Sequence, residues 1–476
     1  MSCSSVEAAE SDREYQTGGN MFAHERVRLF FCLMLALVCC AWLAPAALAV
    51  PGPGFAWTSA YAPGTTGSTP LSLIPGSAGT LYVAGQLDRG FLSLPDGATT
   101  AIAGLDPVTG SPLWQVTTTG PRGAGLLFAD AAADSAGRVT VAGTSAAGAW
   151  DIAVGRLAAD GSWQWMRRAT GARGANDMAR AVAVSASGSS YVGGWGSAAG
   201  YGSDGVVLKY DASGVLRWKY VLRTRGDDEI ADIAIDGAGA VYALGTRNGS
   251  SRNGRIFLAK LTRTGRAAWT RTLGQTSVPH FGEKLITTKD GITVTGIWGG
   301  STTNHPVVAR YTSAGVRLWV TRDDTDMLEF GDAAVDPAGR VVVAGDAVGT
   351  DTTASSNLLV FDATGARSTL ATFKYSTGDN PSTAIYALGV DGGSRVYAAV
   401  REGQTYTIYR YPAPAGTPWS AEQTWDGLID DGDIVSSRFG SLLVAADDNV
   451  FVAGSRDAGS SVWVGCVKKL GASPTP

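Results

Sequence analysis

Acidic clusters interrupt a weakly charged chain and are the first candidates for chemistry. Charged residues make up 17% of the 476 residues, yet carboxylates crowd three short stretches. The members are Asp227, Asp228 and Glu229; Asp323, Asp324 and Asp326; and Asp430, Asp431 and Asp433. Carboxylate oxygens are preferred ligands of calcium, so a calcium site is one interpretation. Solvated loop charges are the alternative, and the sequence leaves both open.

Tryptophan and histidine side chains form the second set of candidates. They fall at the ends of predicted strands or in the loops beside them: Trp150, Trp195, Trp298, His280 and His305. Aromatic rings present flat apolar faces, on which a sugar ring could stack. The alternative is that the tryptophans cap the hydrophobic core. Together with Asp323, Asp326, Asp430 and Asp433, these residues are the candidate ligand-binding set.

Common catalytic signatures are missing from the sequence. Only His280 and His305 follow the first 49 residues, and no His-Glu-x-x-His pattern occurs. The chain has no Gly-x-Ser-x-Gly elbow in a strand-to-helix setting and no phosphate-binding glycine loop followed by Lys-Ser/Thr. A catalytic pair of carboxylates, as in a glycosidase or lyase, is still an alternative, because the distance between two carboxylates cannot be read from a sequence. No catalytic residue is therefore assigned.

Charge and cysteine content exclude two further kinds of site. The formal net charge is −4 and no basic stripe is present, so nucleic-acid binding is not expected. Four of the five cysteines precede residue 50, and only Cys466 follows. A single cysteine can form neither an internal disulfide nor a cysteine metal site.

A phrase close to Val-Tyr-Val-Ala-Gly recurs about once every 50 residues, which is typical of repeat architectures. Its copies end at Gly85, Gly143, Gly194, Gly245, Gly296, Gly345, Val400 and Gly454. Within residues 178–222, four short strands alternate with tight turns, as in one blade of a propeller. The sequence therefore predicts an all-β fold, a single propeller with eight four-stranded blades; seven blades are the alternative.

Two features recur with the same period and predict contacts between blades. A tryptophan follows the turn glycine before the fourth strand in five repeats: Gly110/Trp114, Gly161/Trp165, Gly214/Trp218, Gly265/Trp269 and Gly315/Trp319. A large ring at a fixed place buries apolar area between neighbours. The third strands share a basic residue: Arg156, Lys209, Lys260, Arg310, Arg410 and Lys469. We interpret it as an ion-pair or hydrogen-bond element between blades.

Two resemblances rest on these repeats. The segment 105–114, Leu-Asp-Pro-Val-Thr-Gly-Ser-Pro-Leu-Trp, is similar to the tryptophan-docking repeat of quinoprotein-type propellers. The other blades resemble bacterial secreted propeller repeats of the SBBP type, in which a strand such as 204–210 precedes an Asp-x-x-Gly turn. Together they cover about residues 55–470 and imply a propeller fold without a particular activity. Adjacent cysteines like those of quinone-dependent dehydrogenases occur only at Cys39-Cys40, so a quinone cofactor is not expected.

The eighth repeat lacks a fourth strand, and the start of the propeller segment offers one. The repeat ends near Leu470, whereas residues 54–61 read as an orphan fourth strand that includes Trp57. We expect this strand to complete the last blade, because closure removes two exposed sheet edges. The predicted organisation is a leader at 1–49, the propeller at 50–471 and a short tail at 472–476.

The first 49 residues have the features of a secretory signal. Arg26 and Arg28 precede an apolar stretch from residue 29 to 42, and Ala47-Leu48-Ala49 offers a cleavage site. The stretch is short for a membrane span, and no second one follows. An uncleaved anchor is the alternative, and Met21 is an alternative start. We expect a protein that is secreted or held at the cell surface.

Two functional hypotheses remain at this level. The first is an exported, non-catalytic propeller, a monomer that binds a glycan, a peptide or a cell-envelope component and needs no cofactor except optional calcium. The second is an extracellular enzyme, carbohydrate-active or quinone-dependent, that acts at the central channel of the propeller. The absence of catalytic signatures favours the first.

Overall fold

The chain divides into two compact units, Met1–Ala46 and Ala47–Pro476. Within the second unit, the computed structural model describes residues 55–60, 69–76, 80–87, 99–123, 125–147, 149–169, 176–197, 202–249, 254–274, 278–299, 304–322, 328–347, 353–376, 384–402, 405–412, 423–425, 441–445, 447–457 and 463–470. The predicted leader lies outside these ranges. Within them the only helix is η2 (Pro121–Gly123), and none has the length and apolarity needed to cross a membrane.

The described residues of the second unit form eight antiparallel sheets of four strands, here called blades 1 to 8. The first four contain β2 (Thr69–Pro75), β3 (Leu81–Leu87), β4 (Thr99–Leu105) and β5 (Pro112–Thr118); β6 (Leu127–Ala133), β7 (Val139–Ala147), β8 (Ala149–Leu157) and β9 (Trp163–Ala169); β10 (Asp177–Val184), β11 (Ser190–Ser197), β12 (Ser203–Tyr210) and β13 (Leu216–Leu222); and β14 (Glu229–Ile235), β15 (Val241–Arg247), β16 (Arg255–Leu261) and β17 (Ala267–Leu273).

Blades 5 to 8 repeat the pattern, and the last recruits the first strand of the chain. They contain β18 (His280–Thr288), β19 (Gly291–Gly299), β20 (Asn304–Tyr311) and β21 (Arg317–Arg322); β22 (Leu328–Val335), β23 (Val341–Ala347), β24 (Thr353–Phe361) and β25 (Arg367–Ser376); β26 (Ala384–Val390), β27 (Val396–Glu402), β28 (Thr405–Tyr411) and β29 (Gln423–Trp425); and β30 (Ser441–Val444), β31 (Val450–Asp457), β32 (Trp463–Leu470) and β1 (Phe55–Ala60).

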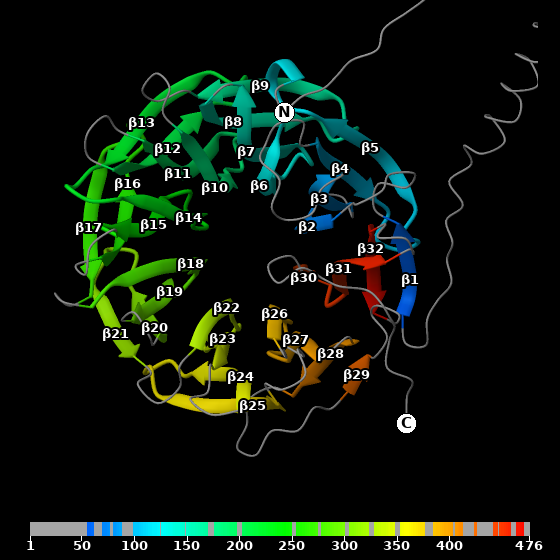
Figure 1. Cartoon of the computed structure of the whole chain (residues 1–476), viewed down its shortest axis with the longest axis vertical. Helices are drawn as coiled ribbons and strands as arrows, with labels where there is room; N and C mark the ends of the chain where they lie inside the picture. The colour runs from blue at the N-terminus through cyan, green and yellow to red at the C-terminus, as the bar shows by residue number, and fades with distance from the viewer. Residues whose placement is uncertain are drawn as a thin grey trace, which may run out of the picture. The chain divides into compact units, whose positions relative to one another are not determined.

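The blades stand in a ring, with the first strand of each nearest the axis (Figure 1). Each inner strand contacts the inner strands of the blades before and after it, including β30 against β2. The hydrophobic core lies between blades: Val207 of blade 3 packs with Ile230 and Phe257 of blade 4. The prediction of an eight-bladed β-propeller is therefore confirmed.

The ring closes through the N-terminal strand, as predicted. β1 pairs antiparallel with β32, from Phe55 opposite Leu470 to Ala60 opposite Cys466. The last blade is thus built from both ends of the propeller segment. Because β32 would otherwise be an unpaired edge, this pairing ties the first residues of the ring to the last.

The recurrent tryptophans dock onto the next blade, which confirms the packing prediction. Trp218 of β13 donates its indole N–H to the carbonyl of Arg263 at 2.9 Å and lies against Gly265. A Cβ at Gly265 would come within 2.6 Å of that ring, and its φ of 80° also favours glycine. The other indole–carbonyl pairs are Trp114–Ala159 (2.8 Å), Trp165–Ala212 (3.1 Å), Trp269–Ser313 (3.4 Å) and Trp319–Ala363 (2.9 Å).

The basic residue of the third strand also reaches the next blade in three described cases. The fully buried Arg156 of blade 2 pairs with Asp134 and donates to the carbonyl of Gly188 in blade 3. Arg310 of blade 5 donates to the carbonyl of Gly339 in blade 6. Lys260 donates to the carbonyl of Ser313 at 3.2 Å. The predicted structural role is confirmed for these three residues.

Candidate functional site

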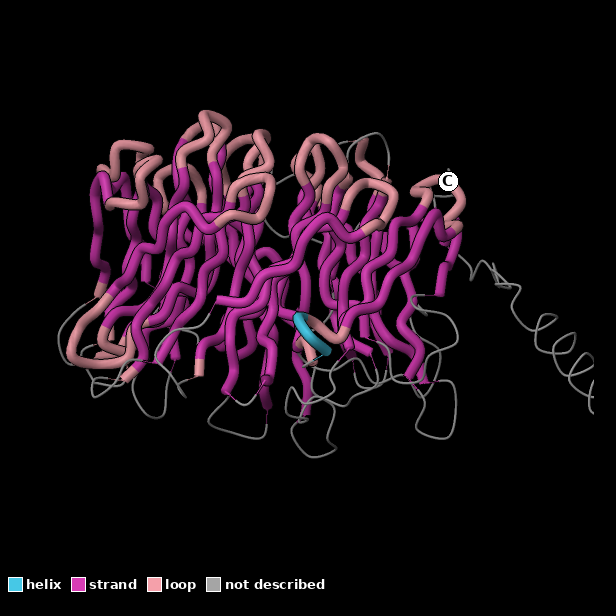
Figure 2. Tube along the Cα trace, turned by 90° about the horizontal axis from the view of Figure 1, so that it is seen from above, coloured by secondary structure: helices cyan, strands magenta, loops and turns pink. Residues whose placement is uncertain are grey.

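The connections between strands separate onto two faces of the ring (Figure 2). The turn face carries the turns from first to second and from third to fourth strands, such as 134–137 and 158–161. The loop face is the opposite side, where second strands lead to third strands and each blade leads to the next. Antiparallel strands reverse direction at each end, so successive connections alternate between these faces.

On the turn face, the aspartates that open the turns serve the turns themselves. Asp211 accepts hydrogen bonds from the N–H groups of Val215 (3.0 Å) and Ser213 (2.9 Å). Asp362 accepts from the Thr364 hydroxyl (2.7 Å) and from the N–H of Ala366 (3.0 Å). These bonds hold the pKa of both carboxyl groups below the ordinary value. The repeated carboxylates of this face are therefore scaffold.

Two predicted tryptophans lie at the loop-face ends of separate blades. Trp150, in β8 of blade 2, is half-buried, and its backbone N–H donates to Asn176 Oδ1 at 3.1 Å. Trp195, in β11 of blade 3, is half-buried and pairs with Met178 and Gly205 on the neighbouring strands. The predicted acidic residues Asp323, Asp326, Asp430 and Asp433 lie outside the described residues.

The other three predicted residues come together in blade 5. Trp298 of β19 stands directly opposite His280 of β18 and His305 of β20. The ring centroids of Trp298 and His305 are 4.9 Å apart, and those of His280 and Trp298 are 6.1 Å apart at 22°. The guanidinium carbon of Arg322, on β21, lies 5.7 Å from the Trp298 centroid. All four strands of this blade thus contribute to one cluster, called here the blade-5 cluster (His280, Trp298, His305 and Arg322).

His280 is the buried centre of the blade-5 cluster. Its side chain has no exposed surface, and its ring lies against Gly274, where a Cβ would come within 2.9 Å. Its Nδ1 is 2.8 Å from the carbonyl oxygen of Val278. Burial lowers the pKa of His280 below 6.5, and the charges of Arg322 and Arg255 lower it further. The imidazole is therefore neutral at physiological pH.

The side chains of the first acidic stretch, Asp227 to Glu229, form hydrogen bonds and an ion pair with neighbouring residues. Asp227 accepts from the N–H of Ser203 at 2.9 Å, and Glu229 pairs with Arg180. Asp228 is fully buried and accepts from the Thr224 hydroxyl at 2.9 Å and from the N–H of Asn248 at 2.8 Å. Among the described residues, no group of three or more acidic, histidine or cysteine side chains is placed to hold a metal ion.

Three aspartates around the axis were not singled out from the sequence. Each follows a β-bulge in an inner strand and accepts two backbone N–H bonds, one from its own strand and one from the inner strand of the next blade. The pairs are Asp130 with Ala131 and Val182 (both 2.8 Å), Asp232 with Ile233 and Leu285 (both 2.7 Å), and Asp332 with Ala333 and Leu388 (both 2.8 Å). We call them the inner-ring carboxylates.

The inner-ring carboxylates have a recognisable position in the repeat, which could have identified them from the sequence. Each aspartate precedes the glycine that ends the repeated phrase by 13 residues, at Gly143, Gly245 and Gly345. They occupy blades 2, 4 and 6, and Ser441 in blade 8 makes the matching bond to the N–H of Leu73 in blade 1 at 3.1 Å. Inner strands of alternate blades therefore clamp the blade that follows.

Desolvation gives two of these half-buried carboxylates, Asp130 and Asp232, a raised proton affinity. It raises the pKa of Asp130 to about 7 and that of Asp232 to about 6, although backbone N–H bonds oppose the shift. The ammonium group of Lys284, on β18, forms an ion pair with Asp332 and also favours the ionised form of the other two carboxylates. Asp130 and Asp232 thus place two carboxyl groups with raised pKa values on inner strands of the ring.

We expect the free energy of unfolding to fall as pH rises from 5 to 8, on the order of 2 kcal/mol. Asp130 and Asp232 bind protons more tightly when folded than when unfolded, so their contribution is complete below about pH 4 and lost as pH rises through 6 and 7. His280 acts in the opposite direction, since its lowered pKa disfavours folding as pH falls below 6.5. Denaturant unfolding at pH 5, 6.5 and 8 measures the slope.

The matched variant for this slope is the double substitution Asp130→Asn with Asp232→Asn. It cannot ionise at either position, so its stability is expected to change less between pH 5 and pH 8 than that of the native chain. Equal slopes for both proteins would contradict the assignment.

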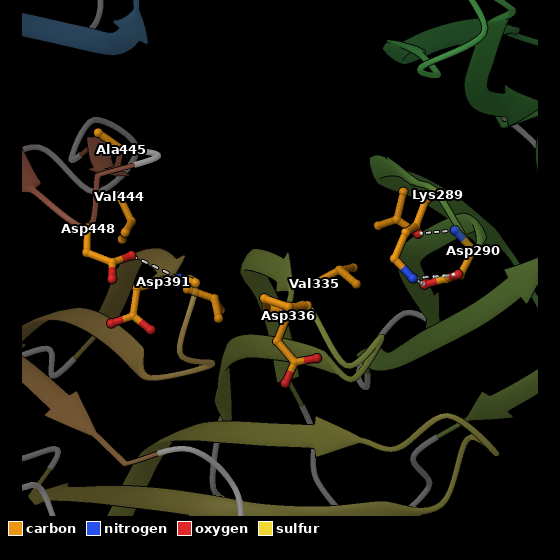
Figure 3. A pocket seen from close by; sticks show the side chains of 12 residues that line it. Lys289, Asp290, Val335, Asp336, Asp391, Val444, Ala445 and Asp448 are labelled. Carbon is orange, nitrogen blue, oxygen red and sulfur yellow. Dashed lines mark hydrogen bonds and ion pairs between the residues drawn. The ribbon is translucent and has the colours of Figure 1, made fainter.

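A pocket of about 330 Å³ opens on the turn face, among the turns of blades 5 to 8 (Figure 3). Val335, Val390 and Val444 contribute apolar surface to it. Asp336 and Asp391 also line it, but they pair with Arg340 and Arg395 of their own turns. These two carboxylates are therefore already paired. Asp290 and Asp448 line the pocket too; Asp290 pairs with Lys289, and Asp448 lies 3.6 Å from Arg395.

Comparisons with known proteins report fold only. No protein-family model matches the chain, and no curated protein matches its sequence. Sqt1 from Chaetomium thermophilum has a TM-score of 0.49 at 10% identity, covering 86% of this chain and 97% of that one. The WD40 domain of SCAP from fission yeast has a TM-score of 0.46 at 9% identity, covering 87% and 98%.

A third solved structure, a PL25 ulvan lyase bound to an oligosaccharide, has a TM-score of 0.44 at 10% identity, covering 85% of this chain and 94% of that one. Such low identities and TM-scores carry no information on ligand, partner or activity for this protein.

Proposed function

We propose that this protein is an exported, non-catalytic β-propeller that binds a ligand or a protein through its loop face. The supporting observation is the blade-5 cluster, in which two histidines, a tryptophan and an arginine meet at the loop-face end of one blade. The two histidines and the tryptophan do not recur at the same places in the other repeats, whereas Arg168 of blade 2 occupies the place of Arg322. Residues that do not follow the repeat are not needed in every blade for folding, so they are better candidates for ligand binding.

The remaining predicted residues extend this candidate surface around the rim. Trp150 and Trp195 place half-buried indole rings at the loop-face ends of blades 2 and 3. Nearby ion pairs join Asp151 to Arg168 and Asp204 to Arg223. Aromatic residues and arginine are enriched at protein–protein interfaces, and aromatic rings also offer flat apolar faces to a sugar. We propose a glycan, a peptide or a cell-envelope component as the ligand class.

The test measures binding of the full-length chain to a glycan array, a peptide library and isolated cell envelopes. At least one ligand is expected to bind without being converted. Replacing His305 or Trp195 by alanine is expected to weaken its binding about tenfold or more, because each removes contact area at the rim. Lys289→Ala, an exposed change on the turn face, is the matched control and should bind normally. If only Lys289→Ala weakens binding, the ligand binds on the turn face and the proposed loop-face site is wrong.

The inner-ring carboxylates favour a second candidate, an extracellular carbohydrate-active enzyme. A carboxyl group with a pKa near 7, such as that of Asp130, suits general acid–base catalysis at neutral pH. Against this stands the use of both oxygens of Asp130 and Asp232 in backbone hydrogen bonds. Release of reducing ends from polysaccharides, lost in Asp130→Asn while folding persists, would decide for the enzyme.

Export is a separate part of the proposal and rests on the leader. If residues 1–49 are a cleaved signal, the protein recovered outside the cytoplasm begins at Val50. Sequencing the N-terminus of that material tests the proposal. A first residue at or before Met21 would indicate a retained leader instead.

A further inference from the structure

Two buried polar atoms in the blade-5 cluster lack a hydrogen-bond partner among the described residues. They are Nε2 of His280 and Nε1 of Trp298. The two residues stand opposite each other on adjacent strands, with nearly parallel rings. Leaving a buried polar atom without a partner costs about 1–3 kcal/mol. Two such atoms on facing residues whose ring centroids are 6.1 Å apart therefore indicate a position where another molecule supplies the missing bonds.

The bonding roles of the two atoms follow from their surroundings. The carbonyl oxygen of Val278 can only accept, so the proton of the neutral imidazole lies on Nδ1, and Nε2 is an acceptor. The indole Nε1–H of Trp298 can only donate. The cluster thus offers one acceptor and one donor from neighbouring side chains.

This combination selects the chemistry of the partner. A hydroxyl group can donate to Nε2 and accept from the indole N–H at the same time. A carboxylate or a dianionic phosphate has no proton to donate to Nε2, and an ammonium or metal ion cannot accept from the indole. The guanidinium of Arg322, close to the Trp298 ring, further disfavours a cation. A neutral group that carries both a donor and an acceptor satisfies both atoms, and a hydroxyl does so through a single oxygen.

The rings also determine how a ligand approaches. His305 and Arg322 both lie within 6 Å of the Trp298 ring centroid, and His280 lies beside it. Gly274 closes in on the His280 ring, where even a methyl group would clash. Recognition therefore uses the polar edges of these rings, and stacking of a sugar on the indole face is not the mode that this geometry supports.

We propose that the blade-5 cluster binds a hydroxyl group of a sugar or another polyol, held between Nε2 of His280 and the Nε1–H of Trp298. The inference rests on the proposed function, because it names the ligand class for the same face. A bound water would offer the same bonding, and the experiment separates these two sources.

The test follows tryptophan indole N–H signals by NMR in the full-length chain during titration with glucose, galactose, mannose and glycerol. The Trp298 signal, assigned with Trp298→Phe, is expected to shift saturably with at least one of them and not with ammonium chloride. The Trp218 indole, bonded to Arg263 in the turn-face docking site, is the internal control and should stay in place. A Trp298 signal that no polyol shifts would overturn the proposal and leave a structural water.

Two variants of His280 separate recognition from folding. His280→Phe keeps a ring but removes the acceptor and is expected to raise the polyol Kd at least tenfold. His280→Gln restores an acceptor oxygen and is expected to retain binding. If Phe and Gln bind alike, His280 is not the acceptor and the proposal fails.

The outcomes also distinguish this inference from the proposed function. If a ligand binds on the array but no polyol shifts the Trp298 indole N–H signal, the hydroxyl site is wrong and the proposed binding function stands. If neither the array, the peptides, the envelopes nor the polyols bind, both are wrong.

Discussion

Deleting residues 54–62 lowers the melting temperature by at least about 10 °C, or leaves the protein insoluble, if β1 closes the ring as described. β1 forms one side of blade 8 and pairs along β32 from Phe55 to Ala60. Its loss exposes the edge of β32, which other chains could then pair with. It also removes the link that ties the start of the propeller to its end. Thermal unfolding followed by circular dichroism measures the effect.

Two controls make this deletion specific. Removing residues 472–476 also shortens the chain at one end, yet it takes away no described strand and is expected to leave the melting temperature within about 1 °C. A synthetic peptide of residues 54–62, added to the truncated protein, is expected to restore part of the lost stability. An unchanged melting temperature in the truncated protein would refute the closure.

Replacing Asp332 by alanine is expected to lower the free energy of unfolding by about 3 kcal/mol or more. The substitution removes the acceptor for the backbone N–H groups of Ala333 and Leu388 and leaves Lys284 without its ion-pair partner. Each buried donor that loses its acceptor costs about 1–3 kcal/mol. Chemical denaturation of both proteins at pH 7 gives the difference.

Asp290→Ala is the matched control for this substitution. Asp290 lies on the turn face, is about half exposed and pairs with the exposed Lys289. Its removal is expected to change stability by no more than about 0.5 kcal/mol. The intermediate variant Asp332→Asn keeps one acceptor oxygen and should fall between the two. Equal stability of Asp332→Ala and the native chain would show that the clamp between blades 6 and 7 contributes nothing.

Local sequence chemistry accounts for most of the fold. The turn aspartates and glycines recur because each turn needs an acceptor at its start and a positive φ at its end, as at Asp134 and Gly137. The docking tryptophans recur because each fits the same turn of the next blade. Both patterns repeat with the blade, so the period alone predicts them, together with the strand that closes the ring.

The candidate site was predictable only in part, for a physical reason. His280, Trp298 and His305 attracted attention as residues outside the repeat, but their contact depends on the register of β18, β19 and β20. Asp130 and Asp232 were missed, because each makes its decisive bond to a backbone N–H about 50 residues away. Acidic residues close together in sequence drew attention instead, and Asp227 and Asp228 proved to serve their own loops.

The sequence by itself thus determined the architecture of this protein: the strand period, the turn chemistry, the docking tryptophans and the closing strand. These depend on interactions that every blade repeats, which a periodic sequence records. Only the tertiary structure decided which side chains share a site. Strand register places His280 beside Trp298, and the packing of blade 5 against blade 6 brings Lys284 to Asp332. Such contacts arise from packing between strands and blades distant in sequence, and no local pattern encodes them.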